Sequence, residues 1–175
     1  MICDAILATS FVADAPDQNS LFPSAGGGSA DPRVQAVYWR CIAVFFTSAR
    51  INNPSLELAF FSNVEPPTID GVDLAALMDR LEVTRSILPL TRRLPAGKAM
   101  SWGNVFYFMD IFAHVALYRA HGRLILTDSD MVIAAPLDAM LDELDRADFG
   151  AYRLDTPDDA DINGMSRSMM ATTIC

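Results

Sequence analysis

The sequence has few basic residues, few cysteines and no long uninterrupted apolar run. Its 175 residues contain 13 Lys and Arg against 22 Asp and Glu, a net charge of −9. A chain this acidic repels phosphate backbones and anionic lipid headgroups, so we expect no binding to nucleic acid. The longest apolar stretch, residues 105–120, is interrupted by Asp110, His114 and Arg119. A membrane helix needs about 18 uninterrupted apolar residues, so no integral membrane segment is expected.

Cysteines are also scarce. Cys3, Cys41 and Cys175 are an odd number and lack the spacing of a metal site. Neither a disulfide framework nor a zinc knuckle is therefore expected. The first residues lack the positive region of a signal peptide. These features predict a reduced, cytoplasmic protein.

Apolar residues are plentiful, and their pattern alternates between strand and helix. The chain is 51% hydrophobic and 20% charged, which suits a single domain over residues 1–175 with a sizeable core. Alternating strands and helices predict an α/β fold of three layers, a mostly parallel sheet with helices on both faces. The expected strands are 3–12, 56–62, 84–90, 124–127 and 149–154. The expected helices are 32–52 (with Asp31 as its cap), 74–82, 104–120 and 137–147. In the first of these, apolar residues at helical spacing predict a core face, namely Val34, Val37, Tyr38, Cys41, Ile42, Phe45 and Phe46.

One basic cluster, residues 92–98, stands out in this acidic chain and contains Arg92, Arg93 and Lys98. Two interpretations stay open for it. It is either a solvated loop or a loop that faces a phosphate group.

Two carboxylates follow the apolar strand 124–127 directly, as Asp128 and Asp130. Their mutual repulsion is costly unless a positive charge offsets it, and hard oxygen ligands suit Mg²⁺ or Mn²⁺. Open α/β sheets bind ligands at the carboxyl ends of their strands, where this pair is expected. A plain surface turn is the alternative, because Thr-Asp-Ser-Asp is good turn chemistry.

The segment from Leu124 to Ile133, followed by Pro136 and Leu137, resembles the Asp-X-Asp region of GT-A-fold glycosyltransferases. The resemblance implies a GT-A domain that binds Mn²⁺ or Mg²⁺ and, through it, the diphosphate of a nucleotide sugar. A UDP-sugar is the expected donor, and the acceptor is not specified. Asp130 would bind the metal. Asp128 would contact the ribose or the metal through water, with Ser129 beside the nucleotide.

Other positions add to the resemblance. Asp110 matches the Asp of the family's Asp-X-X-Arg helix, although the Arg position is Ala113. This implies a donor-sugar contact for Asp110, and a structural polar residue is the alternative. Thr9 and Ser10, at the end of the first strand, would bond the nucleoside. Asn163 and Gly164 match a segment that lines the donor sugar in retaining relatives.

Family members usually continue beyond the position of Cys175 with acceptor-binding elements and often a His as third metal ligand. The resemblance therefore implies a chain that lacks its C-terminal acceptor portion. No residue is assigned as the catalytic base.

Two other functions stay open. Thr127 to Val132 also fits the nucleophile loop of haloacid-dehalogenase-like phosphatases, with Asp128 as nucleophile and Asp130 as acid/base. That loop normally lies on the first strand and needs a downstream Lys, and no Lys follows Asp130. A non-catalytic, truncated nucleotide-binding domain is the other alternative.

Overall fold

The computed structural model describes residues 5–14, 21–22, 27–92, 103–118, 122–144, 161–162 and 165–166. The chain forms two compact units, Met1–Leu137 and Asp138–Cys175. The expected single domain over residues 1–175 stays a prediction.

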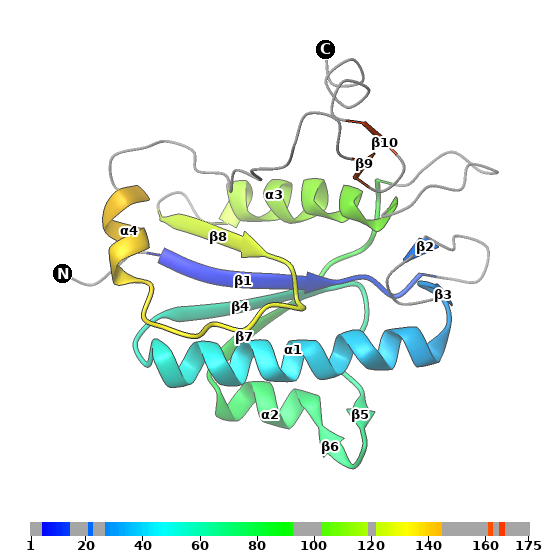
Figure 1. The fold of residues 1–175 in the computed structure, drawn as a ribbon, viewed down its shortest axis with the longest axis horizontal. Coiled ribbons are helices and arrows are strands. Elements are labelled where there is room, and N and C mark those ends of the chain that lie inside the picture. The colour runs from blue at the N-terminus through cyan, green and yellow to red at the C-terminus, as the bar shows by residue number, and fades with distance from the viewer. Residues whose placement is uncertain are drawn as a thin grey trace. The chain divides into compact units, whose positions relative to one another are not determined.

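The first unit is built on a sheet of four parallel strands, in the order β7-β4-β1-β8. The strands are β1 (Ala5–Phe11), β4 (Glu57–Ser62), β7 (Val83–Ile87) and β8 (Arg123–Thr127). Helices flank this sheet, so the predicted α/β architecture with a parallel sheet is confirmed. Parallel strands need crossover connections, and here helices provide them (Figure 1).

Helix α1 (Pro32–Asn52) begins where its sequence predicts. The Asp31 side chain accepts a hydrogen bond from the Arg33 backbone N–H, and proline occupies the first helical position. Both features satisfy or remove amide groups that have no partner inside the helix. The helix covers one face of the sheet together with α2 (Leu74–Arg80) (Figure 1).

The buried face of α1 differs in part from the expected core stripe. The helical spacing favoured Val37 as a core residue, but Val37 is 47% exposed. Trp39 is buried instead, because its ring packs against Phe11 of β1 and Phe60 of β4. The neighbouring Tyr38 is half-buried.

Helix α3 (Tyr107–Tyr118) covers the opposite face of the sheet and follows the short 3₁₀ segment η3 (Gly103–Phe106). Tyr107 and Ile111 are fully buried and pack in one cluster with Ile6 and Ala8 of β1. The Tyr107 hydroxyl donates to the Leu88 carbonyl oxygen at 3.0 Å.

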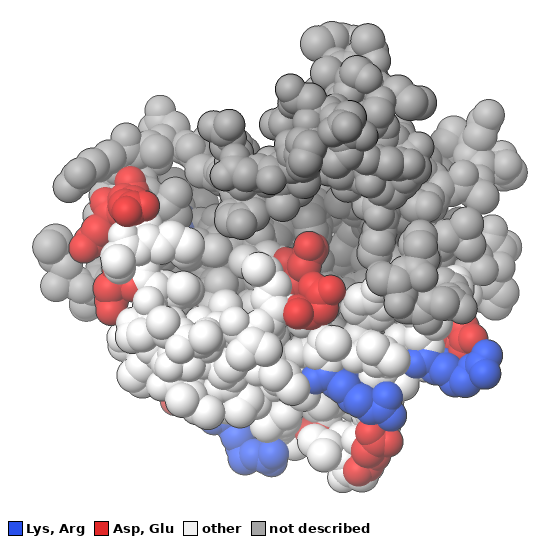
Figure 2. Space-filling view, in the orientation of Figure 1, with Lys and Arg blue, Asp and Glu red and all other residues white. Residues whose placement is uncertain are grey.

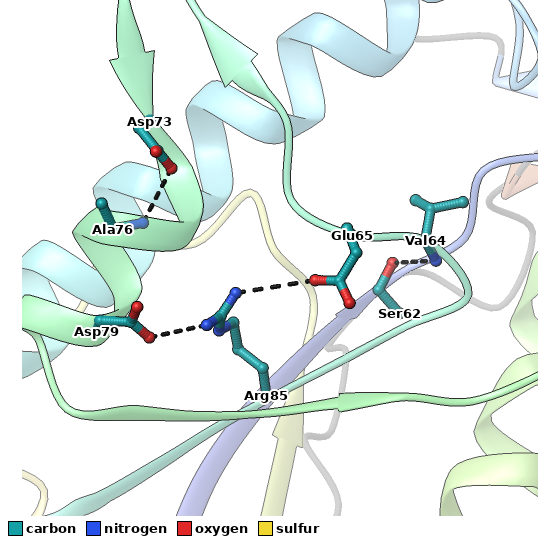
Figure 3. A network of polar contacts seen from close by, with 7 residues as sticks. All are labelled: Ser62, Val64, Glu65, Asp73, Ala76, Asp79 and Arg85. Atoms are coloured by element: carbon teal, nitrogen blue, oxygen red, sulfur yellow. Dashed lines mark hydrogen bonds and ion pairs between the residues drawn. The ribbon is translucent and has the colours of Figure 1, made fainter.

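Strand β7 lies at one edge of the sheet and ends at Ile87, before the predicted limit at Leu90. Pro89 lacks the amide hydrogen that a longer strand would need for pairing. Figure 3 shows how the Arg85 guanidinium links this strand to its surroundings. It lies 2.9 Å from the Asp79 carboxylate of α2 and 3.8 Å from that of Glu65.

The remaining elements are short. Asp73 caps α2 by accepting from the Ala76 N–H at 2.9 Å (Figure 3). Two antiparallel pairs complete the first unit: β2 (Leu21–Phe22) with β3 (Gly27–Gly28), and β5 (Thr68–Ile69) with β6 (Val72–Asp73). The second unit contains α4 (Asp138–Leu144) and the antiparallel pair β9 (Asp161–Ile162) and β10 (Met165–Ser166).

The predicted strand 149–154 lies outside the described residues. Among the helices that are described, none has both the length and the apolar character that crossing a bilayer requires.

Candidate functional site

The direction of chain winding reverses beside β1. From β1 the chain adds β4 and then β7 on one side, whereas β8 pairs with the other side of β1. In open parallel sheets, ligands bind outside the carboxyl ends of the strands at such a reversal. The carboxyl ends of β1 and β8 therefore mark the place where this fold favours a ligand.

An acidic turn, defined as Asp128, Ser129 and Asp130, follows the carboxyl end of β8 directly. Asp128 and Asp130 are exposed, whereas Ser129 between them is buried. Figure 2 shows an acidic patch where Figure 1 draws the turn after β8, and the neighbouring surface of α1 is uncharged. The predicted position of both carboxylates at a strand end is confirmed.

The environment of the acidic turn affects the carboxyl of Asp128. Partial desolvation by the surrounding protein raises the pKa of the Asp128 carboxyl. The negative charge of Asp130 raises this pKa further. Within the described part of the chain, no Lys, Arg or His forms an ion pair with either carboxylate. The turn therefore carries negative charge that no described side chain neutralises.

Two residues of α1, Tyr38 and Cys41, are under the electrostatic influence of the acidic turn, and both are half-buried. Burial raises the pKa of the Tyr38 hydroxyl, and the charges of Asp130 and Asp128 contribute to this shift. Burial and the charge of Asp130 likewise raise the pKa of the Cys41 thiol. Tyr38 is therefore within electrostatic range of both carboxylates, and Cys41 is within range of Asp130.

After the acidic turn, the chain runs back along α1 as a strap, defined as residues 131–137. The Ile133 N–H donates to Ser48 Oγ at 3.0 Å, and Asn52 Nδ2 donates to the Ile133 carbonyl oxygen at 2.8 Å. Nearer the end of the strap, the Leu137 N–H donates to Asn53 Oδ1 at 2.8 Å. Side chains of α1 and of the residue that follows it, Asn53, thus provide hydrogen-bond partners for the strap backbone.

Thr9 and Ser10, the predicted nucleoside contacts, lie at the carboxyl end of β1 beside β8. Thr9 is fully buried, and its hydroxyl donates to the Thr127 carbonyl oxygen at 2.9 Å. This bond joins β1 to the residue that precedes the acidic turn. Ser10 is half-buried. The nucleoside role of both residues stays a prediction, and the described contact of Thr9 is structural.

Asp110, the predicted donor-sugar contact, lies on α3, the helix that covers the face of the sheet opposite α1. Its carboxylate accepts hydrogen bonds from the Thr91 N–H (2.9 Å), the Thr91 hydroxyl and the Arg92 N–H (3.3 Å). Burial alone would raise the pKa of Asp110, but these bonds and the Arg92 charge lower it below its ordinary value. The described partners of Asp110 all belong to the segment after β7, and none belongs to the acidic turn.

Several predicted positions lie outside the described residues. These are Asn163, Gly164 and residues 93–98, which make up most of the basic cluster. His114 is described, and its ring packs edge-on against Phe61 with centroids 6.2 Å apart. It lines a cavity of about 40 Å³ between α3 and the sheet. This cavity includes no residue of the acidic turn.

The donor set of the acidic turn fits a hard divalent cation that carries a phosphate ligand. Across the described residues, no group of three His, Cys, Asp or Glu side chains comes together in a metal-binding arrangement. Mg²⁺ is commonly held by one or two carboxylates together with substrate phosphates, rather than by an all-protein cage. Asp128 and Asp130 would supply the protein's share of such a shell.

Sequence reasoning missed the α1 residues that lie near the acidic turn or bind the strap. Tyr38 and Cys41 have apolar neighbours at helical spacing, which indicated core positions. Ser48 and Asn52 belong to no motif, and both bind Ile133, which lies more than 80 positions away in the sequence.

In the comparison with known proteins, the chain matches no family model, no curated protein and no solved structure.

Proposed function

We propose that this protein is a metal-dependent glycosyltransferase of GT-A type, which moves a sugar from a nucleotide-diphosphate sugar to an acceptor. One observation carries this proposal. Asp128 and Asp130, which no described side chain neutralises, follow β8, the strand that pairs with β1 on the side opposite β4. That position is where parallel sheets bind nucleotides, and paired carboxylates there suit a cation bound to phosphate.

Within this proposal, Asp130 binds the metal, and Asp128 contacts the ribose or binds the metal through water. Bound Mn²⁺ or Mg²⁺ would supply Lewis-acid neutralisation of the charge that develops on the departing nucleoside diphosphate. The chain's own contribution is to hold two carboxylates in place before the ligand arrives. A UDP-sugar is the proposed donor, because the resemblance of residues 124–137 implies it, and the proposed location is the cytoplasm.

Calorimetric titration of the full chain with UDP, with and without Mn²⁺, tests the proposal. We expect UDP binding that requires Mn²⁺ and is lost in Asp130→Ala. Asp142→Ala is the matched control, because it removes an exposed carboxylate of α4 outside the acidic turn. Equal UDP binding with and without the metal would contradict the proposal.

A phosphatase assay, combined with the UDP titration, distinguishes the two alternative functions. Hydrolysis of a generic phosphate ester that is abolished by Asp128→Ala would support a phosphatase. A chain that neither binds UDP with Mn²⁺ nor hydrolyses the ester would be a non-catalytic domain.

A further inference from the structure

The acidic turn is anchored on both sides by side chains that lie outside it. On its amino-terminal side, the Thr9 hydroxyl binds the carbonyl oxygen of Thr127, the last residue of β8. On its carboxyl-terminal side, Ser48 and Asn52 bind Ile133, three residues after Asp130. The turn is therefore a short bridge between two fixed points.

The carboxyl-terminal anchor binds both polar groups of one strap residue. Ser48 Oγ accepts from the Ile133 N–H at 3.0 Å and donates to the Phe45 carbonyl oxygen at 2.9 Å. Asn52 Nδ2 donates to the Ile133 carbonyl oxygen at 2.8 Å and to that of Ser48 at 3.1 Å. Residues 48 and 52 are four apart and so lie on the same side of the helix.

Asp130, Met131 and Val132 connect the turn to this anchor, and all three are exposed. Met131 and Val132 are apolar side chains in contact with solvent, so their packing contributes little to fixing the backbone. The burial of Ser129 and the Thr9 bond restrain the amino-terminal part of the turn, so the freedom of its carboxyl-terminal part depends on the hydrogen bonds at Ile133. A ligand that must order a loose turn loses affinity through the entropy of that ordering.

We propose that Ser48 and Asn52 are positioning residues that hold the acidic turn in the geometry required to bind a divalent cation. Their hydrogen bonds go to the strap backbone rather than to the carboxylates, so they act through Asp128 and Asp130. The consequence for cation affinity rests on the proposed function. The effect on the order of the turn does not.

The double variant Ser48→Ala/Asn52→Ala tests this role in the full chain. Replacing residues that orient metal ligands typically reduces metal affinity 10–100-fold, so we expect the variant to bind Mn²⁺, in the presence of UDP, at least about 10-fold more weakly. We also expect backbone ¹⁵N order parameters at Ser129 and Asp130 to fall from about 0.85 to below about 0.6. Ser48→Thr, made alone in the wild-type chain, keeps a hydroxyl at the same position. This variant should retain the wild-type Mn²⁺ affinity and order parameters.

Asn63→Ala is the matched control. The Asn63 side chain also binds both polar groups of one loop residue, since Oδ1 accepts from the Ala13 N–H at 2.8 Å and Nδ2 donates to the Ala13 carbonyl oxygen at 2.9 Å. It fastens the loop after β1 instead of the strap. We expect it to lower the melting temperature about as much as the double variant, while Mn²⁺ affinity and the order of the acidic turn stay unchanged.

Two results would overturn the positioning role. One is unchanged order parameters at residues 129–130 in the double variant. The other is a more mobile turn that binds Mn²⁺ as tightly as the wild type. A wild-type chain that binds no Mn²⁺ in the presence of UDP overturns the proposed function instead, and the order parameters alone then decide the role of Ser48 and Asn52.

Discussion

Asp110 and the acidic turn are two carboxylate sites with opposite electrostatics. The Asp110 side chain is 10% exposed, accepts hydrogen bonds from Thr91 and Arg92, and lies near the Arg92 guanidinium. Asp128 and Asp130 are exposed, repel each other and pair with no described cationic side chain. The pKa of Asp110 is lowered, whereas that of Asp128 is raised.

This difference separates a structural carboxylate from one that is available to a ligand. The protein already provides donors for Asp110, and a ligand would have to displace them. At the acidic turn, no described side chain supplies a neutralising charge that a ligand would have to displace. A motif that contains Asp does not make this distinction, because the partners come from distant segments.

The largest expected effect is on cation binding by the acidic turn. Asp130→Ala should weaken Mn²⁺ binding by more than about 100-fold, because even residues outside the metal's own ligand set typically account for 10–100-fold. Titration of Mn²⁺ followed by electron paramagnetic resonance measures the free ion directly. Asp110→Ala, which removes the other carboxylate of the comparison, should leave this affinity unchanged. An equal loss in both variants would erase the proposed difference between the two sites.

The next effect is on stability, and it reverses the order of the two sites. Asp110→Ala leaves the amides of Thr91 and Arg92 without their acceptor. Hydrogen bonds to a charged group are worth about 1.5–3 kcal/mol, so the free energy of unfolding should fall by about 2 kcal/mol. Urea denaturation measures this loss. A loss of the same size in Asp130→Ala would contradict the account.

The pH dependence of stability should differ in sign between the sites. For Asp110, the lowered pKa means that its stabilising contribution is present above its ordinary value of 3.8 and is lost as the pH falls through the folded-state pKa. For Asp128, the folded state holds its proton more tightly than the unfolded state. Its effect therefore lowers stability as the pH rises from 3.8 through the raised pKa.

Urea denaturation of the wild type, Asp110→Asn and Asp128→Asn between pH 3 and pH 6 separates these two contributions. Asp110→Asn should reduce the loss of stability on acidification, and Asp128→Asn should remove the decline on alkalinisation. Variants that shift both parts of the profile in the same direction would show that the two carboxyls are not in opposite environments.

The smallest effect concerns Asp128 at neutral pH without metal. Asp128→Asn replaces a partly desolvated negative charge with a neutral group and removes the repulsion from Asp130. The melting temperature should therefore rise slightly. Adding Mn²⁺ should reverse the order and stabilise the wild type more than the variant. Differential scanning calorimetry with and without Mn²⁺ measures both steps. A fall in the melting temperature of the metal-free variant would indicate that Asp128 has a stabilising partner.

Local sequence signals predicted the elements that local chemistry determines. The cap at Asp31, the proline that follows it and the apolar run of β8 lie where the structure has them. The end of β8 at the acidic turn was predicted for the same reason, because its apolar run stops where the carboxylates begin.

Contacts between distant segments could not be predicted in this way. The burial of Trp39 in place of Val37 depends on rings from β1 and β4, and the anchoring of Ile133 depends on a helix more than 80 residues earlier. Polar side chains such as Ser48 and Asn52 are common on helices, so only their neighbours in the fold reveal their role. The partners of Asp110 were hidden for the same reason.

Paramagnetic broadening by Mn²⁺ in the presence of UDP tests the central claim most directly. In ¹H–¹⁵N spectra of the full chain, we expect low concentrations of Mn²⁺ to broaden the amide signals of residues 128–131 first, together with those of Tyr38 and Cys41 on α1. The amide signals of Asp110 and Ile111 should stay sharp at the same concentration. Broadening centred on α3, or spread evenly over the acidic surface, would contradict a cation site at the acidic turn.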